Sequence, residues 1–153
     1  MADYVAAQLA RGRGRLPLER VPYNTELAMQ ALAGFEHIVL VGAKPPVSFF
    51  GYPGKPSTQS PPGAQLHVLA RPGQDAVGAP APLGVGRSAP PAPLPPGGPR
   101  PETASAAPTP EKLAQTVAAL LPEQAIVSDE SVSYGRGFYR HTHAAAPHDW
   151  LHL

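Results

Sequence analysis

The alternation of apolar and polar positions predicts secondary structure in two parts of the chain, separated by a stretch without any period. In the first part, apolar residues recur at helical spacing after Asn24, namely at Leu27, Ala28, Ala31, Leu32 and Phe35. We predict a helix there, with Asn24 as its N-cap, Glu26 in its first turn and Gly34 as its C-cap. The aliphatic run over residues 38–42 predicts a strand buried on both faces, and residues 65–70 predict the next strand.

The second part begins at Thr109, an N-cap residue that is followed by a proline at the first helical position. One apolar stripe runs along this predicted helix, formed by Leu113, Val117, Leu120 and Leu121. Pro122 ends the helix, and residues 125–128 predict another buried strand. Because such a strand needs neighbours on both edges and we expect none after it, we interpret the chain as a piece of a larger protein.

The segment before the first predicted helix offers one more element. Residues 2–10 are good helix formers in amphipathic order and predict a short helix, which the run from Arg11 to Arg15 ends. Alternating arginine and glycine can contact RNA or phosphate. Three arginines are few for that role, so a solvated turn is the favoured interpretation.

Proline and glycine dominate residues 78–108 and set this stretch apart from the rest. The chain has 22 prolines and 15 glycines, a composition near that of low-complexity sequences. Because proline excludes helices and central strands, we predict a semi-rigid linker of polyproline character. Its PxxP spacing also fits a ligand of proline-recognition domains, although such spacing arises by chance in any linker of this kind.

Together the elements predict an α/β fold with partial, doubly wound parallel sheets in two incomplete domains, residues 1–77 and 109–153, joined by the linker. The net charge of +1 gives no electrostatic case for a nucleic-acid or membrane partner. The absence of cysteine excludes disulfides and thiolate metal sites. No apolar run reaches the length of a membrane span, and no signal peptide is evident, so we expect a soluble, cytoplasmic protein.

Three regions carry candidate chemistry. The loop over residues 42–57 has two lysines and three aromatic residues, and it follows the carboxyl end of a predicted strand, where α/β sheets bind ligands. A loop that packs its own aromatic residues is favoured over an anion site, because GxxxxGK[ST] spacing is absent. Near the C-terminus, four histidines could bind zinc, namely His141, His143, His148 and His152. Pro147 and its alanine neighbours predict a loop that fixes no ligand geometry, so we predict no metal site.

The turn after residues 125–128 contains the hydroxyl groups of Ser131 and Ser133 and the carboxylate of Glu130. No GxSxG motif surrounds either serine, so a nucleophile is not indicated. Hydroxyl and backbone N–H groups in a turn are suited to holding a phosphate. Glu130 could act as an acid or base, but nothing in the sequence pairs it, and we predict no catalytic residue.

Two blocks of the sequence resemble thiamine-diphosphate-dependent enzymes of the acetolactate synthase large-subunit-like and benzoylformate decarboxylase-like branch. The first block includes RLPLERVPY and HIVLVGAKPPVSFFGYPGKPS and resembles the second half of their central domain. The second block, residues 111–153, resembles the start of their C-terminal, diphosphate-binding domain. The resemblance implies a parent with three α/β domains, working as a homodimer or homotetramer. It also implies that Glu130, Ser131, Val132 and Ser133 lie in the turn that approaches the cofactor diphosphate.

For the parent, the resemblance implies thiamine diphosphate and magnesium as cofactors and decarboxylation of a 2-oxo acid, followed by carboligation or protonation. The chain departs from this pattern. The metal motif of the family, GDG followed at a distance by NN, is absent, and nothing corresponds to the catalytic glutamate of the N-terminal domain. We therefore expect a fragment that is inactive alone and binds no cofactor stably. A non-catalytic interaction or scaffold protein with a proline-rich tether is the alternative.

Overall fold

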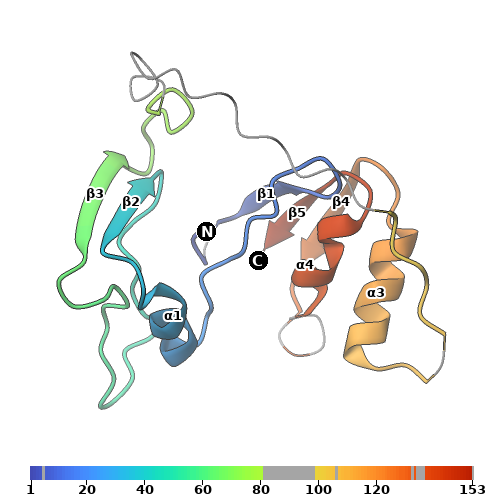
Figure 1. Cartoon of the computed structure of the whole chain (residues 1–153), viewed down its shortest axis with the longest axis horizontal. Coiled ribbons are helices and arrows are strands. Elements are labelled where there is room, and N and C mark those ends of the chain that lie inside the picture. Colours follow the sequence, from blue (N-terminus) through green and yellow to red (C-terminus); the bar gives the residue numbers. More distant parts are fainter. Residues whose placement is uncertain (5, 81–98, 106, 132, 134–136, 153) are drawn as a thin grey trace. The chain divides into compact units, whose positions relative to one another are not determined.

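The computed structural model describes residues 1–4, 6–80, 99–105, 107–131, 133 and 137–152 (Figure 1). These residues form two compact units, one of Met1–Tyr4 with Arg20–Pro91 and the other of Val5–Glu19 with Ala92–Leu153. The architecture is mixed α/β, with a two-stranded sheet in the first unit and a three-stranded sheet in the second. Most of the predicted linker, residues 81–98, lies outside the described residues. No helix in the described ranges is long and apolar enough to cross a membrane.

The regular elements of the first unit are α1 (Thr25–Leu32), β2 (His37–Val41) and β3 (Gln65–Ala70). Asn24 caps α1 as predicted, because its side-chain oxygen accepts the Leu27 N–H at 3.0 Å. The prediction of Gly34 as C-cap is wrong. The cap is Ala33, whose backbone keeps a right-handed helical conformation and therefore does not require glycine.

Strands β2 and β3 lie side by side and pair in parallel, with His37 opposite Gln65 (Figure 1). Both strands were predicted, but the prediction that the first is buried on both faces is wrong for this chain. Leu40 is only 5% exposed, whereas four apolar side chains remain open to solvent: Val39, Val41, Leu66 and Val68. They occupy both faces, because the described sheet of this unit has two strands and lacks the covering layers of a complete α/β sheet.

The three-stranded sheet of the second unit consists of β1 (Gln8–Arg11), β4 (Ala125–Asp129) and β5 (His148–His152). The central strand β5 pairs in parallel with β4 and antiparallel with β1. Three predictions are corrected here: residues 2–10 supply a strand and not a helix, the histidine-rich end supplies a strand and not a loop, and β4 has a neighbour after it in the sequence. The bonds across the sheet outweigh the weak helix propensity of a short segment.

Helix α3 (Pro110–Leu120) packs against the short helix α4 (Phe138–His141) and the 3-10 turn η2 (Thr142–Ala144) (Figure 1). Thr109 is its N-cap, as predicted. The apolar stripe predicted along this helix is not its most buried face. The buried positions are Ala114, Ala118 and Ala119, while Leu113 and Leu120 are exposed. Small alanine side chains allow the close approach of α4 and η2, and they leave the larger leucines outside.

The core of the second unit is centred on Trp150, the single tryptophan of the chain, which is 1% exposed. Its ring meets Tyr139 edge to face, with the ring centroids 5.8 Å apart. The small residues Ala145 and Ala146 are also buried. This core fixes β5 in the middle of the sheet and thereby positions the carboxyl end of the strand.

Candidate functional site

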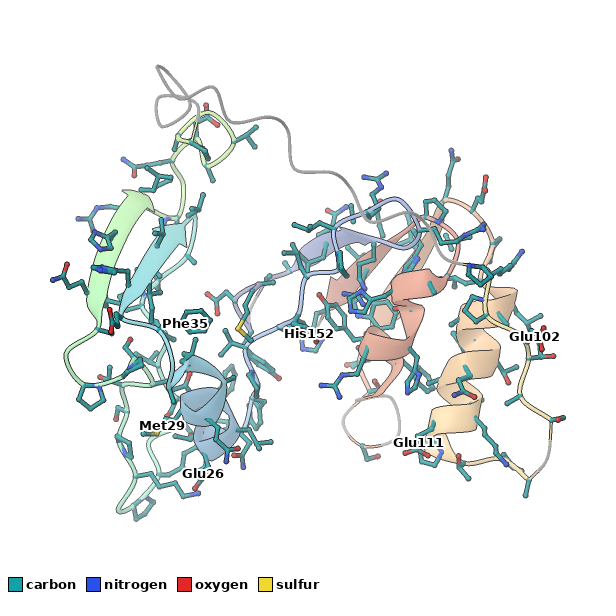
Figure 2. The ribbon with its side chains drawn as sticks, in the orientation of Figure 1. Glu26, Met29, Phe35, Glu102, Glu111 and His152 are labelled. Atoms are coloured by element: carbon teal, nitrogen blue, oxygen red, sulfur yellow. The ribbon has the colours of Figure 1, made fainter. Side chains whose placement is uncertain are left out.

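The parallel strands β4 and β5 end at the same edge of their sheet, and polar side chains gather there. Asp129 ends β4 and is paired in register with His152 of β5, which is labelled in Figure 2. Glu130 and Ser131 follow Asp129 in the turn. Ligands of open α/β sheets bind outside the carboxyl ends of the strands, so this edge is the candidate functional site.

Asp129 organises the edge through both of its carboxylate oxygens. Oδ1 accepts the backbone N–H of Ser131 at 3.0 Å and also its hydroxyl. Oδ2 accepts the indole N–H of Trp150 at 3.2 Å and lies 3.9 Å from Nδ1 of His152. Because the Asp129 side chain is 10% exposed, these partners replace most of the water that a carboxylate otherwise binds.

Sequence reasoning did not single out Asp129. A local signal was available, since an aspartate at a strand end with a serine two residues later is typical of an Asx-turn. The contact with Trp150 has no such signal, because the indole comes from a strand 21 positions further along.

The predicted cofactor-binding residues differ in their exposure to solvent. Glu130 and Ser133 are exposed, Ser131 is half-buried against Asp129, and Val132 lies outside the described residues. Ser131 donates both its N–H and its O–H to Asp129, so neither donor is directed to a phosphate oxygen in this arrangement. Two adjacent carboxylates also repel a diphosphate. The described residues of the turn therefore do not by themselves fit this group, and their assignment to the cofactor stays a prediction.

The C-terminal histidines have separate surroundings. His148 is buried and lies with its Nδ1 2.7 Å from the carbonyl oxygen of Ala146, so Nδ1 carries the hydrogen. Burial lowers the pKa of His148 below its usual value, while the Ala146 carbonyl opposes this shift. Across the described parts of the chain, no three histidine, aspartate or glutamate side chains form a metal-binding group.

A buried arginine ties β1 to the rest of the second unit. Arg11 is 2% exposed, and its guanidinium carbon lies 3.3 Å from the centre of the Tyr139 ring. It donates to the carbonyl oxygens of Tyr139 and, at 3.3 Å, of Leu18. Its Nη2 lies 3.2 Å from Nδ1 of His143, whose Nε2 is 3.3 Å from Glu19 Oε1. The interpretation of Arg11 as part of a solvated turn is therefore wrong.

These contacts define the protonation of His143. Arginine can only donate, so Nδ1 of His143 accepts, and its Nε2 carries the hydrogen that Glu19 accepts. Burial lowers the pKa of His143, and the positive charge of Arg11 lowers it further, against the opposing effect of Glu19. Protonation of Nδ1 would remove the acceptor of Arg11 and place two cations side by side.

Gly12, which follows Arg11, occupies a position that only glycine can fill. Gly12 has a φ of 101°, and a Cβ atom there would lie 2.4 Å from the carbonyl oxygen of Ala146. Only glycine combines this conformation with such a close approach. The first half of the Arg-Gly run therefore has a structural role in the second unit.

In the first unit, the loop over residues 42–57 folds back on itself. Phe49 contacts Phe50 and Tyr23, with ring centroids 4.8 Å and 5.6 Å apart. Lys55 pairs at 2.5 Å with Glu26, which Figure 2 labels, and its hydrogen bond lowers the pKa of that carboxyl group. The rings thus contact one another as the favoured interpretation predicts, although Phe49 and Phe50 remain more than half exposed.

Comparisons with known proteins give one relevant match. No protein-family model matches the chain, and no solved structure matches it. The chain is 45% identical over 148 residues to a curated protein of Mycobacterium tuberculosis strain H37Rv, the "Putative acetolactate synthase large subunit IlvX". The match covers 95% of this chain and 28% of the relative. Over nearly its whole length, the chain is therefore similar to a minor part of a protein named as an acetolactate synthase large subunit.

Proposed function

We propose that the chain is a fragment of a thiamine-diphosphate-dependent, acetolactate-synthase-like enzyme and that it is inactive alone. The observation that carries this proposal is the 45% identity over 95% of the chain to the relative named as an acetolactate synthase large subunit. The same family was indicated by the resemblance of two sequence blocks. The chain spans 28% of the length of that relative, so the greater part of such an enzyme has no counterpart in these 153 residues.

The surface of the chain supports the fragment interpretation. Besides the two faces of the β2–β3 sheet, two elements of the second unit expose a large apolar side chain, Leu120 of α3 at 65% and Ile126 of β4 at 70%. Full burial of one such side chain contributes about 1.5–3 kcal/mol relative to exposure. Surfaces of this kind are typical of strands and helices that are covered in a larger domain.

The activity of the parent belongs to the proposal as well. Thiamine diphosphate, when bound with magnesium, supplies the electron sink for decarboxylation of a 2-oxo acid. The parent reaction would be decarboxylation of a 2-oxo acid with carboligation or protonation, in a homodimeric or homotetrameric enzyme. We assign no chemical step to the residues of this chain, because the described donors at the edge of β4 do not fit a diphosphate.

A direct assay tests the inactivity. The purified, untagged chain is mixed with pyruvate, thiamine diphosphate and magnesium, and release of carbon dioxide is followed. We expect the same rate as in the mixture without protein. Carbon dioxide release that depends on both protein and thiamine diphosphate would refute inactivity. If Ser131→Ala then abolished this release while the exposed control Ser57→Ala kept it, the activity would be assigned to the turn after β4.

A chimera tests the relationship to the relative separately. The matched residues of the Mycobacterium tuberculosis protein are replaced by those of this chain. We expect a folded chimera with the oligomeric state of the unmodified relative and one cooperative thermal transition. A chimera that aggregates, under conditions in which the unmodified relative stays folded, would contradict the proposal that the two segments have the same place in one fold.

A further inference from the structure

Two histidines from neighbouring strands face each other on the sheet of the first unit. His37 opens β2, and the parallel register places Gln65 opposite it and His67 opposite Val39. Since side chains alternate between the faces of a strand, these four residues share one face. Nδ1 of His37 lies 3.0 Å from Nε2 of His67, with the ring centroids 5.2 Å apart. Both histidines and Gln65 are exposed, so this face is accessible to solutes.

The distance between the two nitrogens suits a shared metal ion. A neutral imidazole nitrogen binds metals such as zinc at about 2.0–2.1 Å, so two nitrogens on one ion lie about 2.9 Å apart at a right angle and about 3.3 Å apart in a tetrahedron. The observed 3.0 Å falls between these values. In the metal-free chain the two rings share one hydrogen, as donor and acceptor. Because both side chains are exposed, the rings can turn toward a common ion without movement of the strands.

We propose that His37 and His67 form a binding site for a divalent transition-metal ion, with Cu²⁺ and Ni²⁺ as the preferred ions. Imidazole ligands suit these metals, their affinities stand high in the general order for divalent ions, and they favour right-angled coordination by nitrogen and oxygen. The amide oxygen of Gln65 is the candidate third ligand, because it is directly opposite His37 on the same face. The site belongs to the chain by itself, because further layers of a complete parent domain would cover this face of the sheet.

The surroundings indicate an open site that water completes. Within the described ranges no third histidine, aspartate or glutamate joins the pair. A depression of about 510 Å³ is lined in part by His37 and Gln65 but not by His67, so water reaches the pair through the exposure of both histidines. The pair therefore binds metal as a two-nitrogen chelate, and the loss of either histidine removes the chelate.

The test is a calorimetric titration of the untagged chain with CuCl₂ at pH 7.5, together with copper electron paramagnetic resonance to count the nitrogen ligands. We expect one ion per chain with two imidazole nitrogens, and binding at least tenfold weaker in both His37→Asn and His67→Asn. His141→Asn is the matched control, and we expect it to bind as the wild type does.

Wild-type affinity in either His37→Asn or His67→Asn would overturn the proposal and would leave the pair as a hydrogen bond only. Equal loss in His141→Asn would also overturn it, because the binding would then arise elsewhere. Circular dichroism of each variant checks that the fold is kept. If an asparagine variant unfolds, His67→Gln replaces it, since a longer amide preserves more of the side chain on the exposed face.

Discussion

Replacing Asp129 with asparagine tests the arrangement at the carboxyl end of β4. The carboxylate accepts three hydrogen bonds, two from Ser131 and one from the indole of Trp150. An asparagine of the same shape has a single acceptor oxygen and an NH₂ group that only donates. Whichever way the amide is turned, the NH₂ group faces either the indole N–H or the two donors of Ser131, so at least one bond is lost.

The magnitude follows from burial. Trp150 is 1% exposed, so an indole N–H that loses its partner costs about 1–3 kcal/mol. The bonds that remain also lose the assistance of a charge, because bonds to charged groups contribute about 1.5–3 kcal/mol and neutral ones about 0.5–1.5. We expect Asp129→Asn to lower the free energy of unfolding of the second unit by about 2–3 kcal/mol. At a urea dependence of about 1–2 kcal/mol per molar, this lowers the midpoint by roughly 1–3 M.

The assay is urea unfolding followed by tryptophan fluorescence. Trp150 is the single tryptophan of the chain, so the signal reports on the second unit alone. Asp149→Asn, the same chemical change at a half-buried position one residue before Trp150, is the matched control, and we expect a change of less than about 1 kcal/mol, because Asp149 does not accept the bonds of Ser131 and Trp150. If Asp129→Asn changes stability no more than Asp149→Asn, the assignment of Asp129 as the organiser of this edge is refuted.

Three further predictions concern the rest of the chain. The pKa of His143 is lowered in the folded state, so the unfolded state takes up the proton first as the pH falls. The contribution of neutral His143 to stability is therefore present above pH 6.5 and is lost as the pH falls through the folded pKa. Urea midpoints should decline from pH 8 to pH 5, and His143→Gln should flatten part of this decline. Gly12 and Gly14 both have positive φ, but only at Gly12 would an added Cβ meet the carbonyl oxygen of Ala146. Gly12→Ala should therefore destabilise the second unit by about 1–3 kcal/mol more than Gly14→Ala. Equal unfolding free energies of the two variants would contradict the close approach. Leu120 is exposed, so Leu120→Lys should keep the free energy of unfolding, followed by fluorescence, within about 0.5 kcal/mol of the wild-type value. The same variant should bind less of a hydrophobic dye. A larger loss of stability would show that this leucine is buried.

Local patterns predicted those elements whose bonds lie within a few residues. Asn24 and Thr109 satisfy N–H groups three positions further on, and the structure begins α1 and α3 directly after them. The β-branched and aliphatic runs likewise located β2, β3 and β4, the last of which extends to Asp129. These signals are local in the sequence, so they can be recognised without knowledge of any neighbour in space.

The strand that leads into the candidate site was predicted, but the interactions at its end were not. The turn after the strand at residues 125–128 was recognised, because serine and acidic residues at a strand end are visible in the sequence. The roles of Asp129 and Arg11 were not, since Asp129 is engaged by Trp150 and Arg11 by Tyr139, which lies 128 positions away. A sequence pattern carries no information on which distant group supplies such a partner.

The sequence by itself thus determined where most helices and strands of this protein lie and how its two long helices begin. Only the tertiary structure decided that the first residues form β1, that the histidine-rich end forms β5, and that alanines and not leucines make the buried face of α3. The physical reason is that a strand and a buried face are completed by partners: hydrogen bonds across a sheet and close packing between helices depend on which elements meet.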